Sequence, residues 1–489
     1  MKEVPAKLPA ATRRKAIAYA IGPMILSGCG GGGSSDPTPP TPGPSPAPSP
    51  APVPPPPSPP APPSMTQQPA DTSAIAGTAV AFRVGLSNDS GASYQWLRNG
   101  VEIPGATQSS LRLASASLLD SGATFSVRIA NAAGSATSQG ARLTVASPAF
   151  TLIAGAAGPA GAGLIDVDGV GSSARFSMTS PLAVDNEGNI YVGTSGAIRK
   201  VTPAGVVTPF VGQYGQNGRR DGTGSDARIA GALALVFDPV RNVLMLLDAS
   251  AGTNDSTCDP AFALLCPTAT GFVREITLAG TVTTRQPVSG AAVFAGLSIA
   301  PDASIYTAGG NAGAPEIPAF GFYFRAPTAL YRIAASGGAV LVAGNPDVRG
   351  YKDGSAGGAL FYRITGIAAD AKGNLYIVDG KRLRRLSPDG VVTTVAGDPA
   401  VTGPVDGHGT AAAFNFPGAP VAITVDPGGN VLVVDANLIR RISPEGNVST
   451  VAQVTPVDPD MLQAMALGSG GAVYVGGFSY VGRFERIPG

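Results

Sequence analysis

The chain has 489 residues, too many for one ordinary domain, and only 13% of them are charged and 6% aromatic. Its 66 glycines and 46 prolines favour short strands joined by tight turns over long helices. The formal net charge of +1 provides no general field for nucleic acid or an anionic bilayer, and we expect no nucleic-acid partner.

The N-terminal residues 1–28 have the pattern of a secretion signal. Basic residues precede an apolar run over 16–26, which is too short for a membrane span of about 20 residues. The sequence LSGC that ends at Cys29 resembles the lipobox of bacterial lipoproteins. The resemblance implies cleavage before Cys29 and lipidation of its thiol, with an ordinary cleaved signal as the alternative. It also implies a lipid-anchored protein of the cell envelope. Because Gly30 follows the cysteine, the outer membrane is expected, with the chain facing the periplasm or the cell surface.

A linker follows over residues 29–64. It begins with glycines, and more than half of residues 36–64 are proline, so helix and sheet are excluded for lack of backbone donors. The segment is predicted to be a disordered stalk that reaches on the order of 90 Å in polyproline II geometry. A proline-recognition motif is the alternative.

Residues 65–147 contain short runs of alternating hydrophobicity separated by turn residues, which predicts a β-sandwich. The segment resembles the immunoglobulin-like family in YQWLRNG, which holds Trp96, and in DSGATFSV further on. Phe82 and Val127 stand where that family usually has its cysteine pair, and Phe125 replaces its corner tyrosine. We therefore expect a purely apolar core around Trp96 rather than a binding site.

Residues 148–489 carry one pattern six times, centred on an apolar strand. The six centres are NIYV at 189–192, NVLM at 242–245, SIY at 304–306, NLYI at 374–377, NVLV at 430–433 and AVYV at 472–475. Flanking apolar strands make four strands per unit, the count of a propeller blade. The sequence of residues 368–397 resembles NHL repeats, and this resemblance implies a six-bladed β-propeller. The sixth unit lacks an outer strand, and residues 150–155 are predicted to supply it and close the ring.

A second motif, Asp-Gly, recurs eight residues before an aromatic or aliphatic residue. Its aspartates are Asp168, Asp221, Asp353 and Asp406. Because the motif repeats, we interpret it as a structural turn between blades, with loop calcium binding as the alternative. A further set is interpreted as caps of turns between strands: Asp185, Asp238, Asp370 and Asp426.

Six-bladed propellers include calcium lactonases, arylesterases and zinc-dependent lyases, which hold their metal at the central tunnel. Here the predicted tunnel mouths carry no acid or histidine: Ser180-Pro181, Gly231-Ala232, Ala295-Gly296, Thr365-Gly366, Ala419-Pro420 and Leu462-Gln463. The single histidine, His408, lies within an Asp-Gly turn, which excludes a histidine-rich zinc centre. We therefore predict no catalytic residue, no metal and no cofactor.

Two insertions, residues 249–271 and 309–327, lie between the second and third strands of neighbouring blades and are expected on one face. The first contains Cys258 and Cys266, which we predict to form a disulfide, with free thiols as the alternative. A binding rim is predicted from the aromatic residues of the insertions: Phe262, Phe320, Phe322, Tyr323 and Phe324. The alternative is that these side chains only cover the blade tops.

Together these features favour a non-enzymatic, membrane-anchored binding or scaffold module. Its propeller loop face would engage a protein, a glycan or a cell-wall ligand. A metal-dependent lactonase or esterase and a purely structural spacer are the alternatives.

Overall fold

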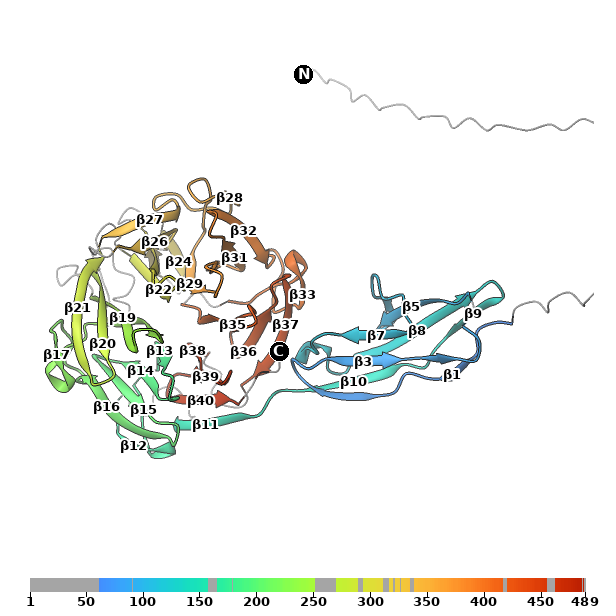
Figure 1. The fold of residues 1–489 in the computed structure, drawn as a ribbon, viewed down its shortest axis with the longest axis horizontal. Helices are drawn as coiled ribbons and strands as arrows, with labels where there is room; N and C mark the ends of the chain where they lie inside the picture. The colour runs from blue at the N-terminus through green and yellow to red at the C-terminus, as the bar shows by residue number, and fades with distance from the viewer. Residues whose placement is uncertain are drawn as a thin grey trace, which may run out of the picture. The chain divides into compact units, whose positions relative to one another are not determined.

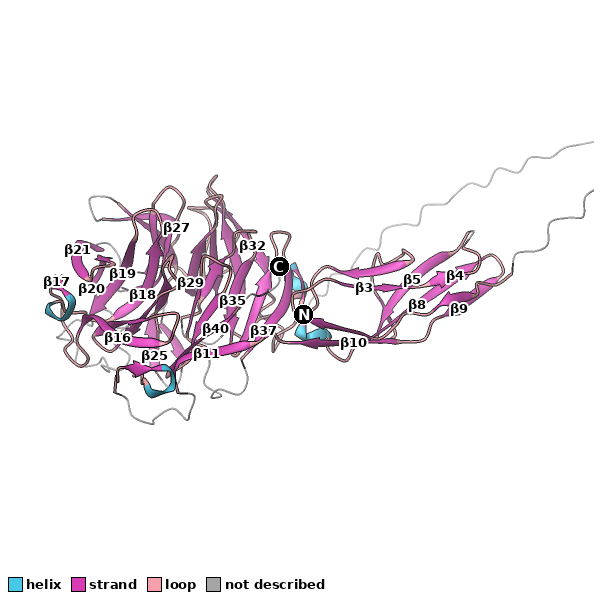
Figure 2. Ribbon diagram, turned by 60° about the horizontal axis from the view of Figure 1, so that its bottom comes forward, coloured by secondary structure: helices cyan, strands magenta, loops and turns pink. Residues whose placement is uncertain are grey.

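The computed structural model describes residues 61–489, with gaps. The gaps are residues 157–164, 251–269, 289–292, 311–315, 335–337, 417–419 and 455–461 and the single positions 90, 178, 320, 321, 326, 486, 488 and 489. The described chain is built almost entirely of β-strands, with a few single-turn 3-10 helices (Figures 1 and 2). No helix in this part of the chain is long and apolar enough to cross a membrane.

The first domain is a β-sandwich. Its larger sheet has the order β2-β10-β8-β5-β6, with β9 paired to β8, and the pairs β3–β7 and β1–β4 complete it. The strands are β1 (Met65–Gln67), β2 (Thr72–Ile75), β3 (Val80–Arg83), β4 (Gly85–Leu86), β5 (Ser93–Arg98), β6 (Val101–Glu102), β7 (Ser110–Leu113), β8 (Thr124–Asn131), β9 (Gly134–Thr137) and β10 (Ala141–Ala146).

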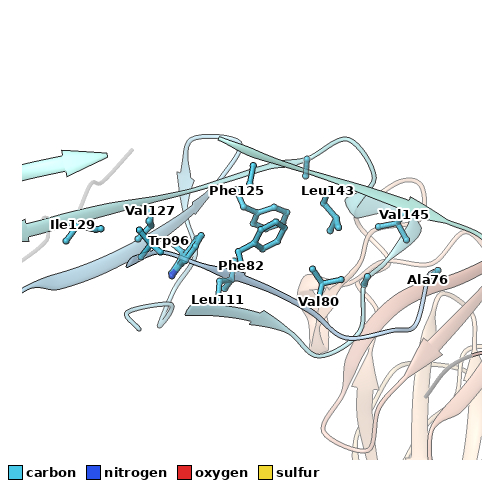
Figure 3. Packing of buried hydrophobic residues seen from close by; sticks show 14 residues of the cluster. Ala76, Val80, Phe82, Trp96, Leu111, Phe125, Val127, Ile129, Leu143 and Val145 are labelled. Carbon is cyan, nitrogen blue, oxygen red and sulfur yellow. The ribbon is translucent and has the colours of Figure 1, made fainter. Parts of the chain in front are cut away.

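The sandwich core is apolar and centred on aromatic rings (Figure 3). Burial alternates along β10, as expected for a strand with one face in the core. Trp96 is fully buried, and its indole N–H donates to the Gln108 carbonyl at 2.9 Å. Phe82 and Phe125 stack with ring centroids 4.7 Å apart. Stacked rings therefore fill the space between the strands, and the one buried polar atom of Trp96 has a partner.

The second domain is a six-bladed β-propeller, with six sheets arranged around a ring (Figure 1). Blade 1 contains β12 (Gly169–Val170), β13 (Leu182–Val184), β14 (Ile190–Thr194), β15 (Ala197–Val201) and β16 (Val206–Gly212). Blade 2 contains β17 (Gly222–Thr223), β18 (Ala232–Asp238), β19 (Val243–Ser250), β20 (Thr270–Thr277) and β21 (Thr281–Val288). Blade 3 contains β22 (Val293–Ile299), β23 (Ile305–Gly310), β26 (Ala329–Ile333) and β27 (Ala339–Gly344), with the inserted hairpin β24 (Glu316–Ala319) and β25 (Phe322–Arg325).

The remaining blades follow the same order. Blade 4 contains β28 (Gly354–Ser355), β29 (Ile364–Ala369), β30 (Leu375–Asp379), β31 (Arg382–Leu386) and β32 (Val391–Ala396). Blade 5 contains β33 (Gly407–His408), β34 (Ile423–Val425), β35 (Val431–Asp435), β36 (Leu438–Ile442) and β37 (Asn447–Gln453). Blade 6 contains β38 (Ala464–Leu467), β39 (Val473–Gly476) and β40 (Tyr480–Phe484).

The strand β11 (Phe150–Gly155) belongs to the same sheet as blade 6. It pairs antiparallel with β40, with Phe150 opposite Phe484 and their ring centroids 5.3 Å apart. The first strand of the propeller sequence is therefore the outer strand of its last blade, which leaves no open ring edge between them.

Four blades carry a fifth short strand, because the Asp-Gly segment pairs with the outer strand of the blade that it precedes: β12 with β16, β17 with β21, β28 with β32 and β33 with β37. Alternating apolar side chains fill the space between adjacent blades, as where Tyr376 and Val378 of blade 4 pack in one cluster with Val431 and Val433 of blade 5. The propeller therefore consists of blades with shared cores around a common axis.

Candidate functional site

A cavity of about 470 Å³ lies at the centre of the ring and is lined by the inner strands of all six blades. Most lining residues are aliphatic, glycine or proline. Ser180, Thr365 and Gln463 line it near the start of their inner strands, at the predicted tunnel mouth. Asp185 is the sole carboxylate among the described lining residues, and it accepts backbone N–H bonds from Glu187 at 3.0 Å and Asn189 at 2.8 Å. The cavity wall is therefore mainly uncharged.

Within the described ranges, no three His, Cys, Asp or Glu side chains come close enough to hold a metal ion together. The carboxylates of the repeated motifs are instead engaged with arginines and backbone amides.

Blade 4 shows how the Asp-Gly motif is used. The buried guanidinium of Arg384 donates to Asp379 at 2.8 Å and to Asp353, the motif aspartate, at 2.9 Å. Its remaining donors reach the carbonyls of Lys352 at 2.9 Å and Leu360 at 3.2 Å. One arginine therefore joins the Asp-Gly segment, the connector before β29 and the end of β30, far beyond the local turn that we expected of the motif.

The carboxylate of Asp379, which we call the inner aspartate of this network, also has hydrogen-bond partners on the backbone. Asp379 accepts backbone N–H bonds from Tyr362 at 2.7 Å and Arg363 at 2.8 Å. The Phe361 ring lies 5.2 Å from the Arg384 guanidinium carbon, so an aromatic face covers the cation. This ring is the aromatic residue eight positions after the motif aspartate, which explains the fixed spacing in the sequence.

A buried arginine paired with the motif aspartate recurs in three other blades, as Arg199, Arg274 and Arg440. In blade 1, Thr194 stands at the position of the inner aspartate, and Arg199 instead lies 3.8 Å from Asp166. In blades 2 and 5 the inner partners are Asp248 and Asp435, each in a fully buried ion pair, at 2.8 and 2.6 Å. Sequence reasoning found the aspartates but missed these arginines. Their signal was available, because each stands in the third strand, in the strings AIRKV, FVREI, RLRRL and LIRRI.

Blades 3 and 6 have neither the buried arginine nor its two aspartate partners. Tyr331 and Gly482 stand where the other blades have the arginine, and Gly309 and Gly477 stand where blades 4 and 5 have the inner aspartate. Neither blade has an Asp-Gly segment. The arginine and the motif aspartate are therefore present together or absent together, which supports a structural role for the motif, because a buried charge without its partner is costly.

Burial and hydrogen bonding act oppositely on the pKa values of these carboxylates. Burial raises the pKa of Asp248 and Asp435, and raises the pKa of Asp379 to about 6 despite the neighbouring arginine. Burial also acts to raise the pKa of the outer Asp221, but hydrogen bonds from Thr284 and Arg274 outweigh it and lower that pKa.

The four predicted turn-capping aspartates make the expected local contacts. In blade 4, the carboxylate of Asp370 accepts the backbone N–H of Lys372 at 2.8 Å and of Asn374 at 2.9 Å. The Asn374 side chain also donates to Asp370, at 2.7 Å. The other three caps accept equivalent bonds: Asp185, Asp238 and Asp426. These groups close turns on the face opposite the insertions.

One cluster on the insertion face extends a pairing that blade 2 also has, where the Arg219 guanidinium lies 3.4 Å from the Phe272 ring centroid. Four side chains of blade 4 lie in the order Arg382, Tyr351, Tyr362, Arg349, and we call them the Arg–Tyr stack. The guanidinium of Arg382 lies 4.0 Å from the Tyr351 ring centroid, and that of Arg349 lies 5.0 Å from the Tyr362 centroid. The two tyrosine rings are 5.1 Å apart and nearly parallel. Gly380 makes room for the stack, since a Cβ there would collide with the Tyr351 hydroxyl.

Three unsatisfied polar groups lie next to the Arg–Tyr stack. Arg363 is half-buried, its Nε has no hydrogen-bond partner among the described residues, and burial lowers its pKa. Two residues later, the buried hydroxyl of Thr365 also lacks a partner within the described chain, and so does that of Thr328. Thr328 follows Pro327, whose carbonyl accepts the N–H of Ile364 at 2.8 Å, so Thr328 lies beside the start of β29.

Most residues singled out from the sequence as sites lie outside the described residues: Cys29, Cys258, Phe262, Cys266 and Phe320. Phe322, Tyr323 and Phe324 form part of β25, where the structure describes the backbone only. That hairpin connects β23 to β26, and the second-to-third-strand connections of all blades leave the ring on one face. The lipidation, the disulfide and the aromatic rim therefore stay predictions.

No protein-family model and no curated protein matches the sequence. Among solved structures, the chain is similar to a protein of unknown function from Bacteroides thetaiotaomicron, at 14% identity over 86% of this chain and 97% of that chain, with a TM-score of 0.47. It is also similar to a gluconolactonase from Xanthomonas campestris, at 12% identity over 69% and 96% of the two chains, with a TM-score of 0.41. A third similarity is to virginiamycin B lyase from Staphylococcus aureus, at 14% identity over 61% and 77%, with a TM-score of 0.35. All three TM-scores lie below 0.5, so the function of this chain has to be inferred from its own residues.

Proposed function

We propose that this chain is an envelope-anchored binding protein that engages its ligand with the insertion face of the propeller. The observation that carries the proposal is the separation of two kinds of polar residue. Charges that repeat from blade to blade are held in buried networks, whereas the arginines of the Arg–Tyr stack lie outside those networks, on the insertion face of blade 4. Blade 2 has one such pair at the equivalent positions, Arg219 on Phe272, but the second tyrosine and the second arginine of the stack occur in blade 4, and this enlargement supports recognition as its purpose.

The remaining parts of the proposal concern placement in the envelope. We propose lipidation at Cys29, a stalk over residues 29–64, a sandwich of immunoglobulin type and a propeller of NHL type. The apolar, ring-filled sandwich supports a spacer role for that domain. In this arrangement the stalk and the sandwich hold the propeller away from the lipid surface.

The test is co-sedimentation of the full-length protein with purified insoluble envelope polysaccharides. A matched variant replaces residues 311–326 with a short Gly-Ser loop, which removes the hairpin and leaves the ends of β23 and β26 in place. We expect the intact chain to sediment with at least one polymer, and the variant to stay in solution with an unchanged melting temperature. Equal behaviour of the two proteins would refute a role for the insertion face.

Elemental analysis of the purified full-length chain separates this proposal from the lactonase or esterase alternative. Near-stoichiometric calcium or zinc after purification without chelator would favour the enzyme. Retention of binding after dialysis against EDTA is the result that the binding proposal predicts.

A further inference from the structure

A second cavity, of about 420 Å³, lies between blades 5 and 6 on the face opposite the insertions. Its lining includes partly exposed residues of the turns that follow β34 and β38, among them Asp426 and Ser469. Three buried side chains line it as well: Leu432, Arg441 and Val473. The described lining therefore combines apolar side chains with one carboxylate and one guanidinium, in a space large enough for a small molecule.

The repeat shows what is absent from this space. At the position of Leu432, in the second strand of the blade, four other blades have a tyrosine: Tyr191, Tyr306, Tyr376 and Tyr474. The third-strand residue opposite each of these tyrosines is basic: Lys200, Arg332, Arg385 and Arg483. Blade 5 keeps the basic residue, because Arg441 lies opposite Leu432, but it has no ring at this position.

The interface between blades 4 and 5 shows where such a ring packs. Tyr376 belongs to one apolar cluster with Val431 and the partly buried Val425 of blade 5. The corresponding residues of blade 6 are Val473 and Leu467, since each pair lies opposite one another across the first two strands of its blade. Both of these residues line the cavity. The cavity wall is therefore the counterpart of the surface on which a tyrosine ring packs one blade earlier.

The tyrosine hydroxyl has fixed polar partners in the other blades. In blade 4, the Tyr376 hydroxyl is hydrogen-bonded to two side chains, the turn-capping Asp370 and the basic Arg385. In blade 1, the Tyr191 hydroxyl donates to the turn-capping Asp185 at 3.1 Å. The repeat therefore builds a place for a phenol between a carboxylate and a cation.

Blade 5 retains both of these polar partners. Asp426 accepts the backbone N–H of Asn430 at 2.8 Å, which is the turn contact that Asp370 makes in blade 4. Burial lowers the pKa of Arg441, and the nearby charge of Asp426 opposes that shift, so the two groups interact. A carboxylate has about four lone-pair sites and a guanidinium has five N–H donors, so each can bond a ligand in addition to its protein partners.

We propose that this cavity binds a small phenol, whose ring takes the place of the absent tyrosine ring. The phenol hydroxyl donates to Asp426 and accepts from Arg441, and the ring packs on Leu467 and Val473. A neutral ligand matches the site because the carboxylate and the guanidinium balance one another in charge. The site lies on the face opposite the insertions, so it is a second site that does not depend on the binding function proposed above.

The experiment is calorimetric titration of the full-length chain with p-cresol, which is the tyrosine side chain as a free molecule. The matched ligand is p-methylanisole, in which a methyl group replaces the hydroxyl hydrogen. We expect p-cresol to bind at least tenfold more tightly, because the ether cannot donate a hydrogen bond to Asp426.

Two variants test the site, and one serves as the control. Leu432→Tyr supplies the ring that four other blades carry, so it should abolish p-cresol binding without lowering the melting temperature. Arg441→Gln should weaken binding at least tenfold. Arg385→Gln is the matched control, because it changes the same position of blade 4, where Tyr376 already occupies the space, and it should leave the affinity unchanged. Should either test variant fail to fold, the comparison of the two ligands on the unmodified chain decides.

The outcomes are distinct from those of the binding proposal. Absence of p-cresol binding, equal affinity for p-methylanisole, or undiminished binding by folded Leu432→Tyr would overturn the phenol site. Equal losses in Arg441→Gln and Arg385→Gln would overturn it as well. Removal of residues 311–326 should leave p-cresol binding intact, and Leu432→Tyr should leave co-sedimentation with envelope polysaccharide intact, so each proposal can fail while the other stands.

Discussion

Replacing Arg384 by methionine tests whether the repeated network holds the blades together. The substitution keeps an apolar stem against Phe361 but leaves Asp379 buried without its cation, and it leaves the carbonyls of Lys352 and Leu360 without their donor. Removing one partner of a buried pair costs about 3–5 kcal/mol. The propeller comprises about 340 residues, so its unfolding entropy is roughly 0.7 kcal/mol/K at about 2.1 cal/mol/K per residue. The melting temperature should therefore fall by about 4–7 °C.

The assay is unfolding of the full-length chain followed by far-UV circular dichroism, by heat for the melting temperature and by urea for the free energy of unfolding. Trp96, the single tryptophan, is buried in the sandwich and reports on that domain separately by fluorescence. Its transition should stay within about 0.5 kcal/mol of the wild type, because the substitution lies in another core.

A double variant, Arg384→Met with Asp379→Ala, provides the control for the mechanism. Because it removes both charges, it should cost clearly less than the sum of the two single substitutions. A loss below about 1 kcal/mol for Arg384→Met, or strict additivity in the double variant, would refute the reasoning that the pair is buried and coupled.

Three further predictions follow from the same structure. Burial raises the folded-state pKa of Asp379 to about 6, above its ordinary 3.8, so the folded state binds more protons in that window. The urea midpoint should therefore rise as the pH is lowered from about 7 to about 5. Below about pH 4 it should fall again, because Asp221 has a lowered pKa; a midpoint that falls steadily from pH 7 would contradict the assignment. In the sandwich, Phe125→Ala removes a ring stacked on Phe82 and should lower the stability reported by tryptophan fluorescence by about 3–5 kcal/mol, whereas an unchanged transition would argue against the described core. Cys29→Ser should abolish incorporation of labelled fatty acid and release the chain from membranes; label retained in this variant would place the anchor elsewhere.

The all-β fold and the six-bladed propeller could be predicted because their signals are local and repeat. Residues 374–377 and their counterparts recur with turn residues at fixed offsets, and a repeat of this kind dictates stacked sheets. The structure confirms this fold class. Placement of the aspartates in the repeat was equally visible in the sequence.

What could not be predicted depends on contacts between residues distant in sequence. The pairing of Asp353 with Arg384 spans 31 positions, and although an arginine recurs in the third strand, the sequence does not show that it reaches the Asp-Gly segment. The Arg–Tyr stack is harder still, because Tyr351, Tyr362 and Arg382 stand in three separate segments. Such a site becomes visible when the fold brings its parts together and the unsatisfied nitrogen of Arg363 can be identified.

The central claim is that the insertion face binds a ligand without transforming it. The most direct test is equilibrium dialysis of the full-length chain against a soluble fragment of the envelope polysaccharide with which it co-sediments, with recovery of the ligand and its analysis by mass spectrometry. The account predicts that the sugar is retained by the protein and recovered chemically intact after prolonged incubation. Recovery of a chemically altered product, absent with the variant that lacks residues 311–326, would contradict it and identify the propeller as an enzyme.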